Sequence, residues 1–435
     1  MSVSFLPMNA NWLIEAPNVK KIAIFAVNMK KLSSSSKIEL LSPAGSFESL
    51  AAAVQGGADA VYFGVGQLNM RARSSNNFSI SDLEKIQSVC SEKKVKTYIT
   101  LNTILYDHDM KLMRAIVDGA KKNKISAIIA SDPAAMQYIK DSGVPLHIST
   151  QANITNIETV RYFSNFGDVM VLARELTLKQ VAQITREIER KQLKGPTGDL
   201  IKIEMFVHGA LCMAVSGKCY LSLHSHNASA NRGACIQNCR REYVVKDVEG
   251  DVELLIDNQY IMSAKDLCTI DFIDQIIKAG ASMLKIEGRG RAPDYVYTAT
   301  KCYREAIDSI AEDTYSGKKI ASWKKELSKV YNRGFWDGYY LGRKMGEWSK
   351  DYGSKATQRK IFLGKGRKYF KNVKIGEFKM ETNSLQPGDE ILITGPTTGV
   401  VQTKVREIRV NDEIVKKVSK GDTFSLPVEQ IIRSS

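Results

Sequence analysis

Eight short apolar runs, separated by stretches with helical spacing, are the feature that most constrains the fold of this chain. Between the runs, apolar residues recur three or four positions apart, as at Phe47, Leu50 and Val54, which is typical of amphipathic helices. Alternating strands and helices predict parallel βα units, and eight such units match a (β/α)8 TIM barrel in number and size. An open doubly wound sheet is the alternative, because a sequence does not reveal strand order. The predicted strands are Ile38–Leu41, Ala60–Phe63, Lys96–Leu101, Ala127–Ala130, Leu146–Ser149, Val169–Leu172, Ile201–Val207 and Met283–Ile286.

The seventh unit contains a long insertion between Val207 and the helix that we expect near Asp266. An insertion after a barrel strand lies on the face where barrel enzymes carry their active sites. We therefore expect a catalytic α/β domain over residues 38–310, with its site built partly from this insertion.

Three further segments are expected outside the barrel. Residues 1–37 are expected to form an N-terminal extension. Residues 1–28 show neither a capped helix nor a strand pattern, and Met29 is the expected native start. Residues 311–374 are predicted to be helical first and then a basic linker. Residues 375–435 contain short strands separated by Pro- and Gly-rich turns, which predicts a small C-terminal all-β barrel.

The chain is strongly basic. It has 62 Lys and Arg against 47 Asp and Glu, and its formal net charge is +15. Such a charge is typical of proteins with a polyanionic partner, nucleic acid first and an anionic membrane second, although many basic enzymes have no such partner. The excess is concentrated in Arg343–Lys374, where eleven Lys and Arg stand against two acidic residues.

The sequence argues against a membrane or secreted protein. No apolar run approaches the roughly 18 residues that a membrane-spanning helix needs. Seven cysteines in 435 residues are too few for a disulfide scaffold. We therefore expect a cytoplasmic protein with no membrane partner and no evident obligate protein partner, whose thiols are reduced or bound to metal.

Four of the seven cysteines lie inside the insertion. Cys212, Cys219, Cys235 and Cys239 follow the spacing C-x6-C-x15-C-x3-C, and this clustering predicts a metal site. The C-x2-C pairs typical of structural zinc are absent, so the spacing favours an iron–sulfur cluster over zinc. Four unligated thiols are the alternative. The other cysteines are interpreted as core residues, with Cys268 as a reserve ligand.

Five segments together resemble peptidase family U32, over a span from about Ile38 to the C-terminus. Within that family, the length and the C-terminal β module are most similar to the branch of prephenate-dependent tRNA uridine hydroxylases. The segments are Leu41–Gly45, Gly57–Gly64, Glu204–Cys212, Ser216–Ser222 and Leu284–Arg289.

The resemblance implies an activity and a cofactor. Members of the family were named collagenase-like proteases, and several are oxygen-independent hydroxylases with a [4Fe-4S] cluster. It implies that Cys212, Cys219, Cys235 and Cys239 bind this cluster. The implied reaction is hydroxylation of the wobble uridine of tRNA to 5-hydroxyuridine, with prephenate as co-substrate. Hydroxylation of another RNA, such as ribosomal RNA, and a U32-type peptidase activity are the alternatives.

The expected catalytic residues follow predicted strands. The chain lacks the His-Glu-x-x-His and Gly-x-Ser-x-Gly motifs of common hydrolases. His208, after the seventh strand, is a candidate base or orienting residue, although a structural histidine fits equally well. Prephenate is a dicarboxylate, and Arg71, Arg174 and Arg289 lie where guanidinium groups can bind carboxylates.

Four further polar residues are expected on the same face. Arg73 and Arg291 are additional candidates for carboxylate binding. Asn102 and Gln151 follow the third and fifth strands, where their amides can hydrogen-bond to a uracil edge.

The basic segment Arg343–Lys374 also contains five aromatic residues, among them Phe362 and Tyr369. Basic residues interleaved with aromatics suit an RNA backbone and unpaired bases. A solvated linker whose aromatics pack on the barrel is the alternative. The residues expected to bind RNA are Arg359, Lys360, Lys365, Arg367, Lys368 and Lys371.

Overall fold

The computed structural model describes residues 38–243, 245–246, 253–254, 262–342, 346–350 and 353–433. The predicted N-terminal extension and the start of the basic segment at Arg343 lie outside the described residues. Within the described part, no helix combines the length and the apolar character that crossing a bilayer requires.

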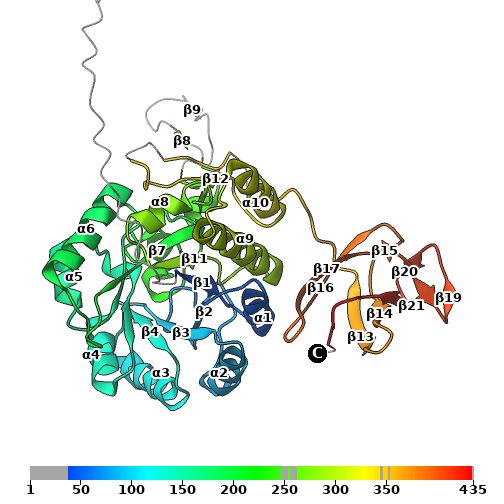
Figure 1. Ribbon diagram of the computed structural model, residues 1–435, viewed down its shortest axis with the longest axis horizontal. Coiled ribbons are helices and arrows are strands. Elements are labelled where there is room, and N and C mark those ends of the chain that lie inside the picture. Colours follow the sequence, from blue (N-terminus) through cyan, green and yellow to red (C-terminus); the bar gives the residue numbers. More distant parts are fainter. Residues whose placement is uncertain are drawn as a thin grey trace, which may run out of the picture. The chain divides into compact units, whose positions relative to one another are not determined.

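Eight parallel strands form a closed barrel (Figure 1). The last of them pairs with the first through Leu40 and Leu284, and with the seventh through Leu284 and Met205. This closure confirms the predicted TIM barrel and shows that the open-sheet alternative is wrong. The barrel strands are β1 (Glu39–Pro43), β2 (Ala60–Gly64), β3 (Lys96–Leu101), β4 (Ala127–Ala130), β5 (Leu146–Ile148), β6 (Val169–Val171), β7 (Lys202–Gly209) and β11 (Met283–Ile286).

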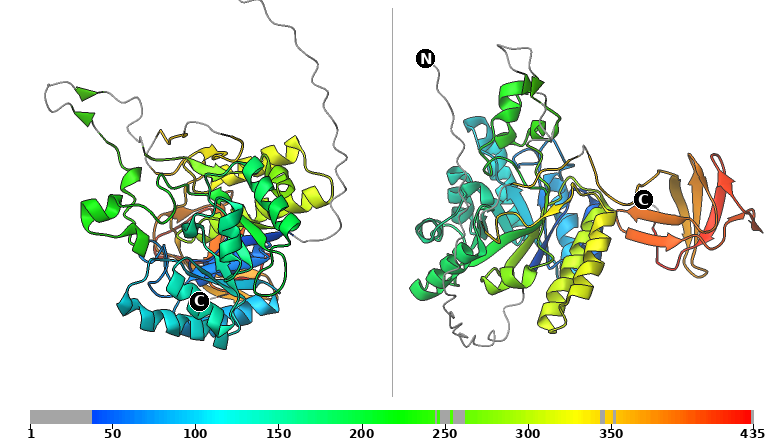
Figure 2. Two further views of the ribbon diagram at one scale, coloured as in Figure 1. Left: turned by 90° about the vertical axis from the view of Figure 1, so that its left-hand side faces the viewer. Right: turned by 90° about the horizontal axis from the view of Figure 1, so that it is seen from above.

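Helices surround the strands (Figure 2). The fourth helix shows how the local sequence determines where a helix begins and ends. The Asp132 side chain accepts a hydrogen bond from the Ala134 N–H, Pro133 takes the first position, and Gly143 ends the helix with φ 78°. The helices are α1 (Phe47–Gln55), α2 (Leu83–Glu92), α3 (Met110–Lys122), α4 (Pro133–Ser142), α5 (Ile157–Phe163), α6 (Leu178–Lys191), α8 (Ile273–Lys278), α9 (Pro293–Ala311) and α10 (Gly317–Lys329).

The interior of the barrel contains a layer of polar side chains. Tyr98, His147, Glu204 and Lys285 are all buried, and the Lys285 Nζ lies 2.7 Å from the Glu204 Oε1. The other carboxylate oxygen of Glu204 is 3.7 Å from the His147 Nδ1, and the Tyr98 and His147 ring centroids are 4.6 Å apart. Barrel interiors are usually filled by branched apolar residues, and a buried ion pair is rarely the more stable choice. The layer therefore points to function rather than to stability.

The insertion after β7 contains α7 (Leu221–His226) and a hairpin of β8 (Val245–Lys246) and β9 (Glu253–Leu254). The prediction of a helix near Asp266 is wrong. That segment is strand β10 (Asp266–Cys268), which pairs antiparallel with β7 and parallel with β12 (Phe335–Trp336). Pairing on both sides explains why a short apolar stretch becomes a strand here.

The C-terminal region is all-β, as predicted, its strands pair antiparallel, and it has its own core around Met380, Ile408 and Val418. It begins with a strand at Gly364, within the segment predicted as a linker. Most side chains of that strand are exposed, so its sequence shows no apolar alternation. The strands are β13 (Gly364–Phe370), β14 (Ile375–Met380), β15 (Ser384–Leu385), β16 (Glu390–Gly395), β17 (Gly399–Lys404), β18 (Arg409–Val410), β19 (Glu413–Ile414), β20 (Val418–Ser419) and β21 (Thr423–Pro427).

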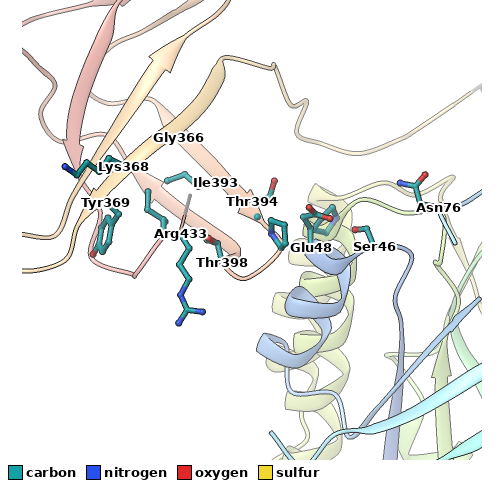
Figure 3. Close-up of a pocket in the computed structure, with 14 residues that line it drawn as sticks. Ser46, Glu48, Asn76, Gly366, Lys368, Tyr369, Ile393, Thr394, Thr398 and Arg433 are labelled. Carbon is teal, nitrogen blue, oxygen red and sulfur yellow. Dashed lines mark hydrogen bonds between the residues drawn. The ribbon is translucent and has the colours of Figure 1, made fainter. Parts of the chain in front are cut away.

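The C-terminal region contacts the first helix of the barrel. The Gln55 side chain accepts a hydrogen bond from the Val400 N–H and donates one to the Val400 carbonyl oxygen, both at 2.8 Å. A pocket nearby is lined by Ser46 and Glu48 at the start of α1 and by β-region residues such as Thr394 (Figure 3). It contains none of the residues that we expected to be catalytic.

Gly45, which follows β1, lies close to the loop after β11 on the functional face of the barrel. A Cβ at this position would lie 2.0 Å from the Arg289 carbonyl oxygen. We expect Gly45→Ala to lower the free energy of unfolding by about 1–3 kcal/mol, because the loop after β11 must move. Gly317→Ala is the matched control, because a Cβ there meets no atom within 4 Å. Urea unfolding checks this, and equal midpoints for Gly45→Ala and the wild type would contradict it.

Candidate functional site

A cavity of about 310 Å³ lies at the carboxyl ends of the barrel strands. It contains the four clustered cysteines and the three arginines expected to be catalytic, from loops far apart in the sequence. Of the further candidates, Arg291, Asn102 and Gln151 also line it, whereas Arg73 does not. The polar lining includes Arg71, Asn102, Gln151, Arg174, Cys212, Cys219, Cys235, Cys239, Lys285, Glu287, Arg289 and Arg291.

Arg71 is held by Glu287 at the wall of this cavity. Its Nη2 and Nε donate to the same carboxylate oxygen, at 2.7 and 3.1 Å. Burial alone would raise the pKa of Glu287, but the charges of Arg71 and Arg289 lower it to about 2. Glu287 is therefore ionised, and it fixes the Arg71 guanidinium in one orientation.

Arg289 is a buried cation with unused hydrogen-bonding capacity. One Nη atom donates to Asn69 and Thr100, at 2.9 and 2.7 Å. The Nε has no partner among the described residues, and the residue is only 5% exposed. Burial lowers the pKa of Arg289 to about 10, so the side chain is still charged at neutral pH. A buried unpaired donor beside a cavity is suited to an anionic ligand.

Arg174 joins the arginine group to the cysteine-rich loop. Its guanidinium donates to the Ser216 hydroxyl at 2.9 Å and to the Ala210 carbonyl at 3.3 Å. Burial raises the pKa of the Cys212 thiol, but the charges of Arg174 and Arg71 outweigh this effect and bring the pKa below its ordinary value. Cys212 is therefore biased toward the thiolate, the form that binds metals.

The four cysteines lie on one wall of the cavity, in the loops after β7. Burial raises the pKa of Cys239, and the charges of the other three thiols raise it further, so the four are close enough to interact electrostatically. Among the described residues, no three His, Cys, Asp or Glu side chains are arranged to hold a metal ion. The four sulfur donors nevertheless match an iron–sulfur cluster in number and chemistry.

The remaining cysteines are buried away from this wall. Cys268, the reserve ligand, lies in β10 and does not line the cavity. Burial raises the pKa of its thiol to about 11, and that of Cys90 and of Cys302 to about 12. All three fit the structural role expected for core cysteines.

His208 does not line the cavity, contrary to the expectation of a catalytic base. It is 2% exposed and packs against the rings of Tyr295, Tyr303 and Phe335. Burial lowers its pKa to about 3, so the imidazole is neutral. A structural role therefore fits His208 better than a catalytic one, because its position on β7 directs the side chain away from the cysteine-containing loop.

Asn102 and Gln151 are hydrogen-bonded to each other in the lining of the cavity. The Asn102 Nδ2 donates to the Gln151 Oε1 at 3.0 Å and to the Ser149 hydroxyl at 3.2 Å. The two amides therefore form one hydrogen-bonded polar group.

The residues expected to bind RNA are all exposed. Lys360 is paired with Asp294 at 2.5 Å, and Lys365 lies 3.4 Å from Glu381. The Lys368 Nζ lies 4.8 Å from the centre of the Phe370 ring. Arg359, Arg367 and Lys371 complete this exposed basic group.

Two charged features in and below the cavity were not identified from the sequence. Glu287, which orients Arg71, lies in the family-like segment Leu284–Arg289, but nothing in the sequence pairs it with Arg71. Lys285 and Glu204 lie inside apolar strands, where a charged residue is itself a signal because burying it is costly.

The fold and the site define a barrel enzyme, because the charged and thiol side chains gather where TIM barrels perform catalysis. The chain belongs to peptidase family U32, whose model matches residues 45–350. It is 56% identical to a collagenase of Porphyromonas gingivalis, over 91% of this chain and 96% of that protein. It is 30% identical to tRNA hydroxylation protein P1 of Bacillus subtilis, over 83% and 84%.

The expected branch of the family matches this chain less strongly than a protein named collagenase does. The collagenase match is stronger than the match to the tRNA hydroxylation protein, at 56% against 30% identity. Among solved structures, the U32 peptidase Mk0906 aligns with 60% of this chain and 96% of its own at 12% identity, with a TM-score of 0.39.

The neutral His208 predicts a pH dependence of stability. The unfolded chain protonates this residue near its ordinary pKa of 6.5, whereas the folded chain does so only near 3. Stability therefore falls as the pH drops through this window, by up to about 1.4 kcal/mol per pH unit. We expect His208→Gln to flatten the dependence in urea unfolding between pH 6.5 and 4. The exposed His224→Gln is the control, and an unchanged slope in His208→Gln would refute the assignment.

Proposed function

We propose that this chain is an iron–sulfur hydroxylase of RNA, acting on the wobble uridine of tRNA. The observation that carries the proposal is that four cysteine thiols line the same cavity as a group of oriented arginines. Cys212, Cys219, Cys235 and Cys239 would hold a [4Fe-4S] cluster, which supplies redox chemistry when bound. The name of the Bacillus subtilis relative supports this reading.

The arginines would bind the carboxylates of prephenate. Arg289 offers an unpaired Nε, and Arg71 is fixed by Glu287 within the same cavity. Two oriented guanidinium groups provide the geometry that a dicarboxylate requires. Arg174 would link this site to the cysteine loop through Ser216.

The amides of Asn102 and Gln151 would orient the uracil. Both line the cavity, and together they offer a donor and an acceptor to a base edge. The exposed basic group of the C-terminal region would hold the RNA backbone.

A peptidase is the second candidate, favoured by the 56% identity to a protein named collagenase. Its nucleophile would be Cys212, whose pKa is lowered by Arg174 and Arg71 against the effect of burial. A thiol nucleophile usually works with a histidine base. No histidine of the described part lines the cavity, and this favours the hydroxylase.

Two cysteine variants separate these candidates. A cluster needs all four thiols, whereas a nucleophile needs only Cys212. We expect the anaerobically purified chain to add one oxygen to wobble uridine in the presence of prephenate, and Cys235→Ala to abolish this. Cys90→Ala, outside the cavity, is the control. Mass spectrometry of tRNA nucleosides measures the product.

The opposite result is equally specific. Collagen cleavage that survives in Cys235→Ala but not in Cys212→Ala, without oxygen transfer to tRNA by the wild type, would establish the peptidase instead.

The basic group predicts a salt-dependent affinity for tRNA. We expect replacement of Lys365, Arg367 and Lys368 by alanine to weaken binding and to reduce the slope of log K against log salt by about one per lost phosphate contact. Alanine at the exposed Lys121 and Lys122 of α3 is the control. Filter binding at several salt concentrations measures this, and an unchanged slope would exclude the group from the interface.

A further inference from the structure

Large apolar side chains are exposed around the mouth of the cavity. Tyr106 is 53% exposed and Tyr220 is 67% exposed. Concentrated apolar exposure of this kind marks an interaction site. We call these residues the mouth surface: Ile104, Tyr106, Met213, Val215, Tyr220, Leu221 and Ile236.

The mouth surface is continuous with the cavity. Met213, Val215 and Leu221 belong to both. The Ile104 N–H donates to the carbonyl of Asn231, which also lines the cavity, and the Asn231 side chain accepts from the Cys219 N–H at 3.1 Å. A molecule bound to the mouth surface can therefore extend directly to the cysteines that line the cavity.

Tyr106 is fixed in place before any partner binds. The Arg232 guanidinium lies 4.0 Å from the centre of its ring, a cation–π contact. Arg232 in turn donates to Asp109 at 2.7 Å, and the buried Asp109 also accepts from the Tyr106 N–H at 2.8 Å. The pair offers a rigid, flat surface that costs little conformational entropy on binding.

The positive charge of the cavity favours an anionic partner. Lys285 and six arginines line the cavity, whereas Glu287 is the one acidic residue among the described residues that line it. Exposed aromatic rings beside a cationic cavity are the combination that binds unpaired nucleotides, through stacking and phosphate contacts together.

We infer that the mouth surface binds the unpaired nucleotides on either side of the modified base, with Tyr106 and Tyr220 stacking on them. This inference rests on the proposed RNA substrate and adds where the strand lies. The target base enters the cavity, while its neighbours remain on the mouth surface.

Binding of a labelled oligouridine of about ten nucleotides to the full chain tests this. We expect Tyr106→Ala and Tyr220→Ala each to weaken binding about tenfold or more, because base stacking is lost. Tyr106→Phe should retain the affinity, because it keeps the ring. Tyr162→Ala is the matched control, since Tyr162 is 61% exposed on α5, outside the mouth surface. An abasic oligomer of equal charge should bind equally to all variants.

Three outcomes would overturn the inference. Wild-type affinity in Tyr106→Ala and Tyr220→Ala removes the stacking role. If Tyr106→Ala and Tyr220→Ala weaken binding of the abasic oligomer by the same factor, their effect comes from charge or folding and not from stacking. Loss of gelatin binding without loss of oligouridine binding makes the surface a peptide site. Tyrosine-dependent RNA binding without hydroxylation would instead refute the proposed function and leave the surface intact.

Discussion

The pairing of β11 with both β1 and β7 closes the barrel and thereby determines where the functional site forms. Because the eight strands are parallel, closure brings all their carboxyl ends to one rim. Arg71, Arg174, Cys212 and Arg289 follow four different strands, yet they line one cavity. The site is therefore a direct consequence of the topology.

Charge burial is the second organising feature. The Lys285–Glu204 pair inside the barrel and the nearly inaccessible Arg289 both cost solvation energy that apolar residues would not. The ion pair between Arg71 and Glu287 offsets part of the cost of burying charge at the cavity. The Nε of Arg289, however, has no hydrogen-bond partner among the described residues. An anionic ligand would complete its hydrogen bonding, which is why the cavity fits a carboxylate or phosphate substrate.

Most of the barrel could be predicted from the sequence, because strand and helix periodicities are local properties. The clustering of Cys212 with Arg71, Arg174 and Arg289 also followed, since in a parallel barrel every segment that follows a strand lies at the same rim. The strand at Asp266–Cys268 could not be predicted, because its pairing partners are distant in the sequence. His208 was misplaced for a related reason: strand alternation near a bulge determines which face a side chain occupies, and the register shift in β11 beside it is visible only in the fold.

The proposed function requires that the four cysteines of the insertion hold one cluster in an arginine-lined cavity. Mössbauer spectroscopy of the full chain, purified without oxygen from cells grown on ⁵⁷Fe, tests it most directly. We expect the signal of a single [4Fe-4S] cluster, with about four iron and four sulfide per chain, and the loss of this signal when Cys239 is replaced by alanine. A chain that binds stoichiometric zinc and no iron, or whose iron signal survives in Cys239→Ala, would contradict it.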